Sequence, residues 1–123
     1  MSPNRFAALC KTVYAGIDSI GWSGGNTTIQ FLEADCPVVT LPGEFMRGRH
    51  STAMLKMIGL EELIAASLPD FIYKLTRLGL DPRFRSAVAK RIAENKHKLY
   101  RDRSFIGALD AFLKENVLLR DQV

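Results

Sequence analysis

A glycine-rich stretch in the first third of the chain limits the folds that this sequence can adopt. Residues 21–25 read Gly-Trp-Ser-Gly-Gly, and they separate an apolar segment, Tyr14 to Ile20, from a segment with helical character, Thr27 to Ala34. A continuous apolar and β-branched run follows from Pro37 to Leu41, as expected of a strand that is buried on both faces. The order strand, glycine turn, helix, strand predicts a βαβ unit and an α/β fold.

After this unit the sequence has the period of helices. Four predicted helices run from Arg49 to Ile58, from a cap at Ser67 to Gly79, from a cap at Asp81 to about His97, and from Ser104 onward. The inner face of the first is expected to carry Ala53, Met54, Met57 and Ile58. The segment Leu63 to Ala65 is too short to classify. We therefore predict one domain, with a βαβ part at residues 1–45 and a helical part at residues 46–123.

Two parallel strands are too few for a stable open sheet, because the inner edges of the strands need partners. This leaves two interpretations. Either another chain completes the sheet, in a homo-oligomer or with a partner chain, or the sequence is a piece of a larger fold.

The composition is that of an ordinary soluble domain. The chain has 123 residues, of which 47% are hydrophobic and 24% are charged. Its apolar stretches are far shorter than the roughly 20 residues of a membrane-spanning helix, and its first residues lack a signal pattern. We expect a cytoplasmic protein without a membrane partner. Cys10 and Cys36 lack metal-ligand spacing, so we expect buried free thiols and no metal.

Basic residues are concentrated between Arg83 and Arg103. This stretch holds eight Lys or Arg residues against Glu94 and Asp102. Such a stretch can attract polyanions, which makes a basic helical nucleic-acid binder one alternative. We favour a solvated helix face, because few aromatic residues interleave the charges, and we do not expect nucleic acid as a partner.

The start of the predicted helix from Thr27 to Ala34 has the features of an anion site. With Asn26 or Thr27 as N-cap, the first backbone N–H groups have no partner inside the helix, and the helix dipole favours negative charge there. Glycines at 24 and 25 let the backbone approach phosphate oxygens, and Thr27 and Thr28 add hydroxyl donors. A diphosphate would fit. The alternative is a tight turn whose glycines serve only close packing, and the spacing alone does not decide between the two.

A family resemblance favours the first reading. The string GGNTTIQFLEADCPVVTLPGEFMRGRHS resembles a segment of the protein O-linked N-acetylglucosamine transferases and their bacterial relatives. Gly59 to Ala65 and Ala15 to Ser19 are similar to the same family, and the resemblance runs from about Phe6 to Val117. It implies a GT-B architecture of two Rossmann-like domains. This chain would be the latter, partial Rossmann-like portion of the C-terminal domain, which holds the UDP part of the donor.

The resemblance also implies site residues. It places five residues near the diphosphate: Gly24, Gly25, Asn26, Thr27 and Thr28. Pro42, Gly43 and Glu44 match a turn that borders the cleft, and Arg49 matches an arginine on the following helix. Without the resemblance, Glu44 reads as a carboxylate near a helix dipole, and Arg49 reads as a surface cation or a partner for Glu44.

One position departs from the family pattern. Counted back from Pro37, Gln30 stands where relatives carry an acidic residue that binds the ribose hydroxyls. An amide lacks the charge-assisted strength of a carboxylate, which puts donor affinity or donor identity in doubt. Glu33 could compensate only if the helix register allowed it.

The implied activity is glycosyl transfer from a UDP-sugar, UDP-N-acetylglucosamine or UDP-glucose, to Ser, Thr or Asn of a protein acceptor. The resemblance implies no cofactor and no metal. It also implies that the acceptor is held by an N-terminal half outside this sequence. We therefore expect the isolated chain to bind UDP weakly or not at all and to show little transfer. A non-catalytic interaction module that retains the fold is a further alternative.

Overall fold

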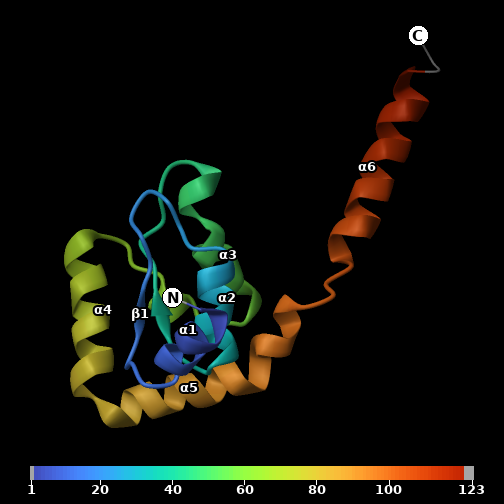
Figure 1. Cartoon of the computed structure of the whole chain (residues 1–123). Helices are drawn as coiled ribbons and strands as arrows, with labels where there is room; N and C mark the ends of the chain where they lie inside the picture. Colours follow the sequence, from blue (N-terminus) through green and yellow to red (C-terminus); the bar gives the residue numbers. More distant parts are fainter. Residues whose placement is uncertain (1, 121–123) are drawn as a thin grey trace.

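The computed structural model of the protein describes residues 2–120, with side chains for residues 2–117. Its helices are α1 (Pro3–Cys10), α2 (Asn26–Glu33), α3 (His50–Met57), α4 (Leu68–Leu80), α5 (Pro82–Asn95) and α6 (Ser104–Arg120). Two strands, β1 (Gly16–Ile17) and β2 (Val38–Val39), lie in the first third, and three short 3₁₀ turns are η1 (Met46–Gly48), η2 (Glu61–Leu63) and η3 (Lys96–Leu99). Figure 1 shows the helices gathered around the strands, with α6 extending away from them.

The predicted βαβ unit is present, with strands shorter than predicted. β1 and β2 are parallel, with Gly16 opposite Val38 and Ile17 opposite Val39, and α2 connects them. Beyond β2, Thr40 forms a parallel bridge with Ile64, and the N–H of Ala65 donates to the carbonyl of Thr40 at 2.8 Å. The segment around Ile64, which the sequence pattern could not classify, therefore extends the sheet by a bridge.

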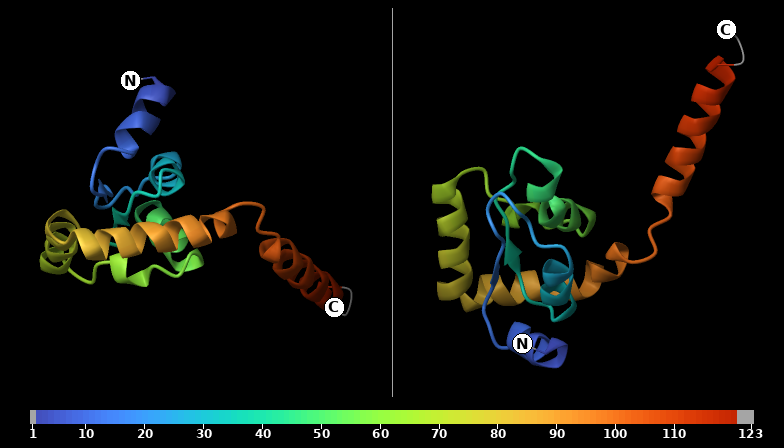
Figure 2. Two further views of the ribbon diagram at one scale, coloured as in Figure 1. Left: turned by 90° about the horizontal axis from the view of Figure 1, so that it is seen from below. Right: turned by 45° about the horizontal axis from the view of Figure 1, so that its top comes forward.

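The core lies between the strands and the helices that surround them, as the two views of Figure 2 show from below and from a tilted direction. It draws residues from α2, β2, α3, α4, α5 and the segment between α3 and α4: Leu32, Val39, Leu55, Ile58, Leu60, Leu63, Ala65, Phe71, Leu78, Val88 and Ile92. Burial of each large apolar side chain stabilises the fold by about 1.5–3 kcal/mol. The core therefore holds the carboxyl end of β2 and the helix α2 in one packed unit.

Local signals for helix ends are confirmed. The Ser67 hydroxyl accepts from the N–H of Asp70 at 3.3 Å, and the Asp81 carboxylate accepts from the N–H of Phe84 at 3.0 Å. Gly59 follows α3 with a φ of +69°, a left-handed conformation that glycine adopts at little cost. In α5 the apolar residues Val88 and Ile92 are buried.

One prediction on the helices was wrong, one was partly wrong, and one helix was missed. The N-cap of α2 is Gly25 and not Asn26 or Thr27, and no side chain caps this helix. The buried residues of α3 are Ser51, Thr52 and Leu55. Of the predicted inner residues, Ile58 is buried and Met54 packs against the core, whereas Ala53 and Met57 are exposed. The helix α1 was not predicted at all. In α3 Ser51 faces inward because it hydrogen-bonds to the glycine turn, as described below, whereas the buried hydroxyl of Thr52 has no hydrogen-bond partner.

The last helix forms as predicted but does not join the core. Residues 101–117 are all exposed, including the apolar stripe of Phe105, Leu109, Phe112 and Leu113. Figures 1 and 2 show α6 projecting from the body of the molecule. Between residues 2 and 120 no helix combines the length and the apolar content needed to cross a membrane.

The two cysteines are free and buried, as predicted. Burial raises the pKa of the Cys36 thiol to about 11, and the nearby Cys10 adds to the shift. Burial also raises the pKa of Cys10. Both thiols therefore stay protonated at neutral pH.

Candidate functional site

The glycine turn between β1 and α2 is held by a buried carboxylate. Asp18, which follows β1 and is 6% exposed, accepts a hydrogen bond from the N–H of Gly24 at 2.7 Å. It also accepts from the hydroxyl of Ser23 at 2.8 Å and from the hydroxyl of Thr40, directly after β2, at 2.7 Å. Hydrogen bonds to an ionised acceptor are about twice as strong as neutral ones. Asp18 therefore fixes the turn to the carboxyl ends of both strands.

A second set of hydroxyl contacts joins the turn to α3. The Ser23 hydroxyl accepts from the N–H of Ser51 at 2.8 Å, and the hydroxyls of Ser51 and Thr28 lie 2.8 Å apart. The carbonyl of Gly24 accepts from Thr28 at 3.2 Å and from Ser51 at 3.3 Å. The turn is thus attached to the beginnings of both α2 and α3.

The loop after β2 packs directly on the same turn. The N–H of Ser23 donates to the carbonyl of Arg47 at 2.7 Å, and the N–H of Gly43 donates to the carbonyl of Gly48 at 2.9 Å. A Cβ atom added to Gly48 would lie 3.1 Å from the Cα of Gly43 and 3.4 Å from the carbonyl oxygen of Gly21. Glycine at these positions lets the two loops come close.

The first turn of α2 presents backbone donors to solvent. No side chain caps the helix, so the N–H groups of Asn26, Thr27 and Thr28 have no partner within it. At Gly25 an added Cβ would meet nothing within 4 Å, which leaves the approach to these groups open. A small pocket of about 70 Å³ lies beside the turn, lined by Ile17, Asp18, Ser19, Gly24, Thr27, Thr28, Phe31 and Val38. In parallel α/β folds, ligands bind at this end of the strands.

The residues predicted to bind the diphosphate lie close together but differ in their exposure and hydrogen bonding. Gly24, Thr27 and Thr28 line the pocket, and Asn26 is exposed at the start of the helix. The side chain of Thr28 is 2% exposed and its hydroxyl is bonded inside the fold. The Thr28 hydroxyl is therefore already used inside the fold, whereas Thr27 is exposed.

Gln30 lies away from this pocket. It lines a different hollow of about 250 Å³ with Ala7 and Lys11 from the α1 region. Phe31 faces the turn pocket instead, and its ring packs edge-on against Phe6 of α1 with the ring centroids 5.6 Å apart. The turn pocket is thus lined by the phenyl ring of Phe31 and not by the side chain of Gln30.

Glu44 and Arg49 are both exposed in the loop that borders the turn. Arg49 stands at the N-cap of α3 and Glu44 precedes η1. In the part of the chain with side chains, no ion pair joins them. The suggested pairing between Glu44 and Arg49 is therefore wrong.

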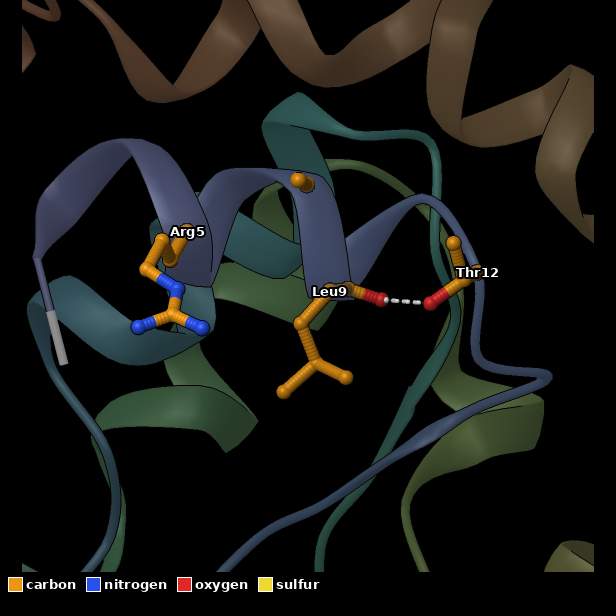
Figure 3. A pocket seen from close by; sticks show the side chains of 4 residues that line it. Arg5, Leu9 and Thr12 are labelled. Carbon is orange, nitrogen blue, oxygen red and sulfur yellow. Dashed lines mark hydrogen bonds between the residues drawn. The ribbon is translucent and has the colours of Figure 1, made fainter.

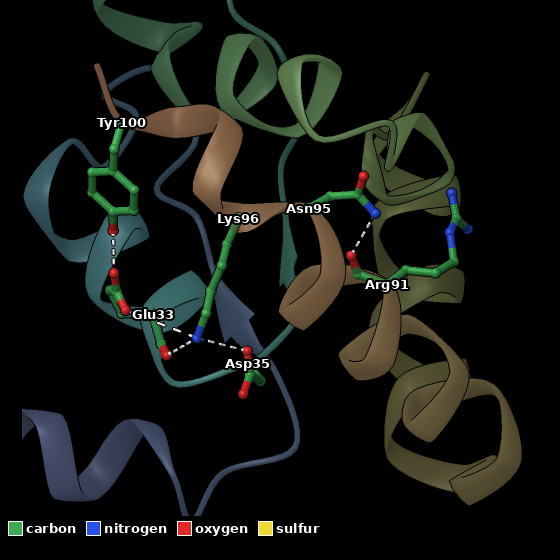
Figure 4. Close-up of polar contacts among 6 residues, drawn as sticks. All are labelled: Glu33, Asp35, Arg91, Asn95, Lys96 and Tyr100. Carbon is green, nitrogen blue, oxygen red and sulfur yellow. Dashed lines mark hydrogen bonds and ion pairs between the residues drawn. The ribbon is translucent and has the colours of Figure 1, made fainter. Parts of the chain in front are cut away.

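The other end of α2 is fixed by a group that we call the Lys96 cluster: Glu33, Asp35, Lys96 and Tyr100 (Figure 4). The Lys96 Nζ donates to the carbonyl of Glu33 at 2.7 Å and lies 2.9 Å from Asp35 Oδ1. The Tyr100 hydroxyl donates to Glu33 Oε1 at 2.6 Å. Glu33 therefore faces α5 and η3, and it does not compensate for Gln30 at the turn.

Several residues of the basic stretch are used inside the fold. Arg85 donates to the carbonyl of Leu78 at 2.6 Å, Arg91 pairs with Glu62, and Lys96 pairs with Asp35. Arg85 also lies over the ring of Tyr14, 4.0 Å from its centroid. Arg85, Arg91 and Lys96 therefore have partners inside the fold, which gives these basic residues a structural role without a nucleic acid.

A larger hollow of about 440 Å³ lies against α1 and contains no predicted site residue. Arg5, Ala8, Leu9 and Thr12 line it (Figure 3). The Thr12 hydroxyl donates to the carbonyl of Leu9 at 2.9 Å, so it is already bonded within the helix end. Across residues 2–117 no group of three or more His, Cys, Asp or Glu side chains is arranged to hold a metal ion.

The sequence reasoning missed Asp18, Ser23, Ser51 and Arg47. Asp18 precedes the turn and Ser23 belongs to it, and a carboxylate directly after a strand was a signal that could have been used. Ser51 lies 28 residues from its partner Ser23, so no local pattern indicates this contact.

Comparison with known proteins identifies the family. The sequence profile of glycosyl transferase family 41 matches residues 15–107. The chain is 29% identical over 84 residues to the UDP-N-acetylglucosamine–peptide N-acetylglucosaminyltransferase of Giardia intestinalis, which covers 68% of this chain and 6% of that protein. It also resembles the solved structure of a mutant O-GlcNAc transferase from Thermobaculum terrenum, with a TM-score of 0.78 and 25% identity over 91% of this chain and 22% of that chain.

The chain therefore spans only a small part of each of these relatives. The resemblance to the protein O-linked N-acetylglucosamine transferases is confirmed in both sequence and fold. Because the family profile covers most of its residues, the chain belongs to glycosyl transferase family 41.

Proposed function

We propose that this chain supplies the diphosphate-binding part of a glycosyltransferase that uses a UDP-sugar. One observation carries the proposal: the open N–H groups at the start of α2, behind a glycine turn that Asp18 holds in place. Membership of glycosyl transferase family 41 supports it. The Giardia relative is named for N-acetylglucosamine transfer from its UDP derivative to a peptide. We extend that donor class, UDP-N-acetylglucosamine or UDP-glucose, and a protein acceptor to this chain.

The chemistry of sugar transfer requires such a site. Negative charge develops on the diphosphate as the bond to the sugar breaks, and preorganised donors stabilise it without reorganising at that moment. The N–H groups of Asn26, Thr27 and Thr28 point along the helix axis toward the open side, where the helix dipole also favours an anion. The hydroxyl of Thr27 and the amide of Asn26 are exposed and can add hydrogen bonds.

The arrangement of the strands supports a place in the C-terminal domain of a GT-B enzyme. β1, α2 and β2 form a parallel crossover unit, and the bridge at Ile64 continues the sheet on the far side of β2. We propose that this is a portion of a Rossmann-like domain, and that the acceptor is held by other parts of the enzyme. The relatives are much longer than the chain, which is consistent with this proposal.

Donor recognition in this part of the site rests on the diphosphate. Asp18 is the one carboxylate that lines the turn pocket, and it already accepts three hydrogen bonds from the protein. Phe31 presents a ring that cannot accept hydrogen bonds from ribose hydroxyls. We therefore propose that the nucleoside adds little to the affinity of this chain.

Calorimetric titration of the purified chain with UDP and with uridine tests the proposal. We expect weak, saturable binding of UDP, in the millimolar range or tighter, and no measurable binding of uridine. Equal binding of the two ligands, or no saturable signal with UDP, contradicts the proposal. Glycosyl transfer to a peptide by the pure chain is not expected.

A further inference from the structure

Arg47 is held against the glycine turn by both its backbone and its side chain. Its carbonyl accepts from the N–H of Ser23 at 2.7 Å. Its guanidinium lies between two aromatic rings, 4.7 Å from the centroid of Phe45 and 5.8 Å from the centroid of Trp22. Trp22 belongs to the turn itself, so the cation lies beside the turn that leads into α2.

The charge of Arg47 is not neutralised by a carboxylate. In the region with side chains, the ion pairs involve Lys74, Lys90, Arg91, Lys96 and Lys114. Arg47 is exposed, and its contacts are with aromatic faces, which attract a cation without cancelling its charge. A positive charge is thereby kept available next to Trp22, in the turn that leads into α2.

The surroundings of Arg47 restrict its movement. The contact between Gly43 and Gly48 closes the loop that carries Arg47, and Gly21 of the turn packs on the same contact. Trp22 and Phe45 are 71% and 58% exposed, so both rings are open to solvent. The backbone of Arg47 is therefore fixed, while its side chain remains accessible.

We propose that Arg47 binds the diphosphate of the donor, together with the first turn of α2, and that Trp22 and Phe45 position its guanidinium. This proposal rests on the proposed function. A guanidinium donates two parallel hydrogen bonds to phosphate oxygens and stays charged at all physiological pH values. It supplies the positive charge that backbone N–H groups alone lack, and it stabilises the leaving diphosphate as its charge develops.

The chain offers a direct reporter for this contact. Trp22 is the sole tryptophan of the sequence and lies against the guanidinium. Movement of Arg47 onto a phosphate changes the surroundings of the indole ring. Titration of the full chain with inorganic pyrophosphate, followed by tryptophan fluorescence and checked by calorimetry, therefore measures the proposed contact.

The variants are Arg47→Ala and, as a matched control, Arg83→Ala, which removes an exposed arginine from α5. A charge-assisted contact corresponds to about tenfold to a hundredfold in affinity. We expect Arg47→Ala to weaken pyrophosphate and UDP binding by about this factor and to reduce the salt dependence, whereas Arg83→Ala leaves both unchanged. Circular dichroism should show both variants folded, and Arg47→Lys should bind more tightly than Arg47→Ala.

The outcomes separate this inference from the proposed function. If the unaltered chain and Arg47→Ala bind UDP and pyrophosphate equally, Arg47 has no role while the proposed function stands. An equal loss in Arg47→Ala and Arg83→Ala also overturns the inference, because it indicates a general charge effect. If the unaltered chain binds neither ligand, the proposed function and the inference fall together.

Discussion

The carboxylate of Asp18 accepts a hydrogen bond from the backbone N–H of Gly24, six residues later in the glycine turn, at 2.7 Å. The same carboxylate binds the hydroxyls of Ser23 and Thr40. One buried side chain thus links the ends of β1 and β2 to the peptide that precedes α2. The orientation of the open N–H groups depends on this link.

Replacement of Asp18 by Ala should therefore destabilise the fold. It leaves the buried donors of Ser23, Gly24 and Thr40 without an acceptor, and we expect a loss of about 3 kcal/mol in the free energy of unfolding. Urea denaturation measures this loss. Asp110→Ala, at an exposed residue of α6, is the control and should change the free energy of unfolding by less than about 0.5 kcal/mol. Equal stability of the two variants would show that Asp18 does not hold the turn.

The two adjacent glycines should respond differently to alanine. A Cβ on Gly24 would lie 2.7 Å from Thr28 Oγ1, so Gly24→Ala must displace the hydroxyl contacts and should cost about 1–3 kcal/mol. On Gly25 a Cβ meets open space. Gly25→Ala should keep the melting temperature close to that of the parent and weaken UDP binding, because the methyl group occupies the approach to α2. Thermal melts and calorimetry separate these effects, and the reverse pattern would rule out the described turn.

The two adjacent threonines should also differ. Thr28→Val removes a buried hydroxyl that pairs with Ser51, and we expect it to lower the free energy of unfolding by about 1–2 kcal/mol. Thr27→Val is nearly isosteric at an exposed position and should leave stability unchanged. It should instead weaken UDP binding if the Thr27 hydroxyl contacts the diphosphate. Denaturation and UDP titration of the two variants side by side check both expectations.

The Lys96 cluster predicts a pH dependence at high pH. Burial and the hydrogen bond to Glu33 raise the pKa of Tyr100 from 10.0 to about 12. A pKa that is raised in the folded state contributes stability below the unfolded value, and this contribution is lost as the pH rises from 10.0 toward about 12. The stability of Tyr100→Phe should therefore fall less steeply than that of the parent in this window. Parallel slopes in urea denaturation at several pH values would contradict the expectation.

What the sequence predicts well depends on neighbours along the chain. The caps at Ser67 and Asp81 bond to N–H groups three residues away, and Gly59 ends α3 through its own backbone conformation. The strand, turn and helix order around residues 21–25 is likewise a local pattern, and it located the open end of α2. Such features form from short-range geometry, so a single sequence is sufficient to find them.

The remaining features depend on distant contacts. Ser51 is buried in α3 because its hydroxyl meets Thr28, 23 residues earlier. The positions of the apolar residues alone had predicted an inner face of α3 without Ser51. The register of α2 is another case. Counting back from Pro37 crosses the bend at Asp35, whose φ is +58°, and so does not reveal that Phe31 rather than Gln30 faces the pocket. The apolar stripe on α6 is the pattern of a helix that packs on a core, so it does not indicate that this helix extends away from the core.

Amide-resolved NMR of the isotope-labelled chain during titration with UDP tests the central claim most directly. We expect the largest shifts at the N–H groups of Asn26, Thr27 and Thr28, and no change at the amides of α5. Saturable UDP binding that shifts amides elsewhere and leaves the first turn of α2 unaffected would contradict it.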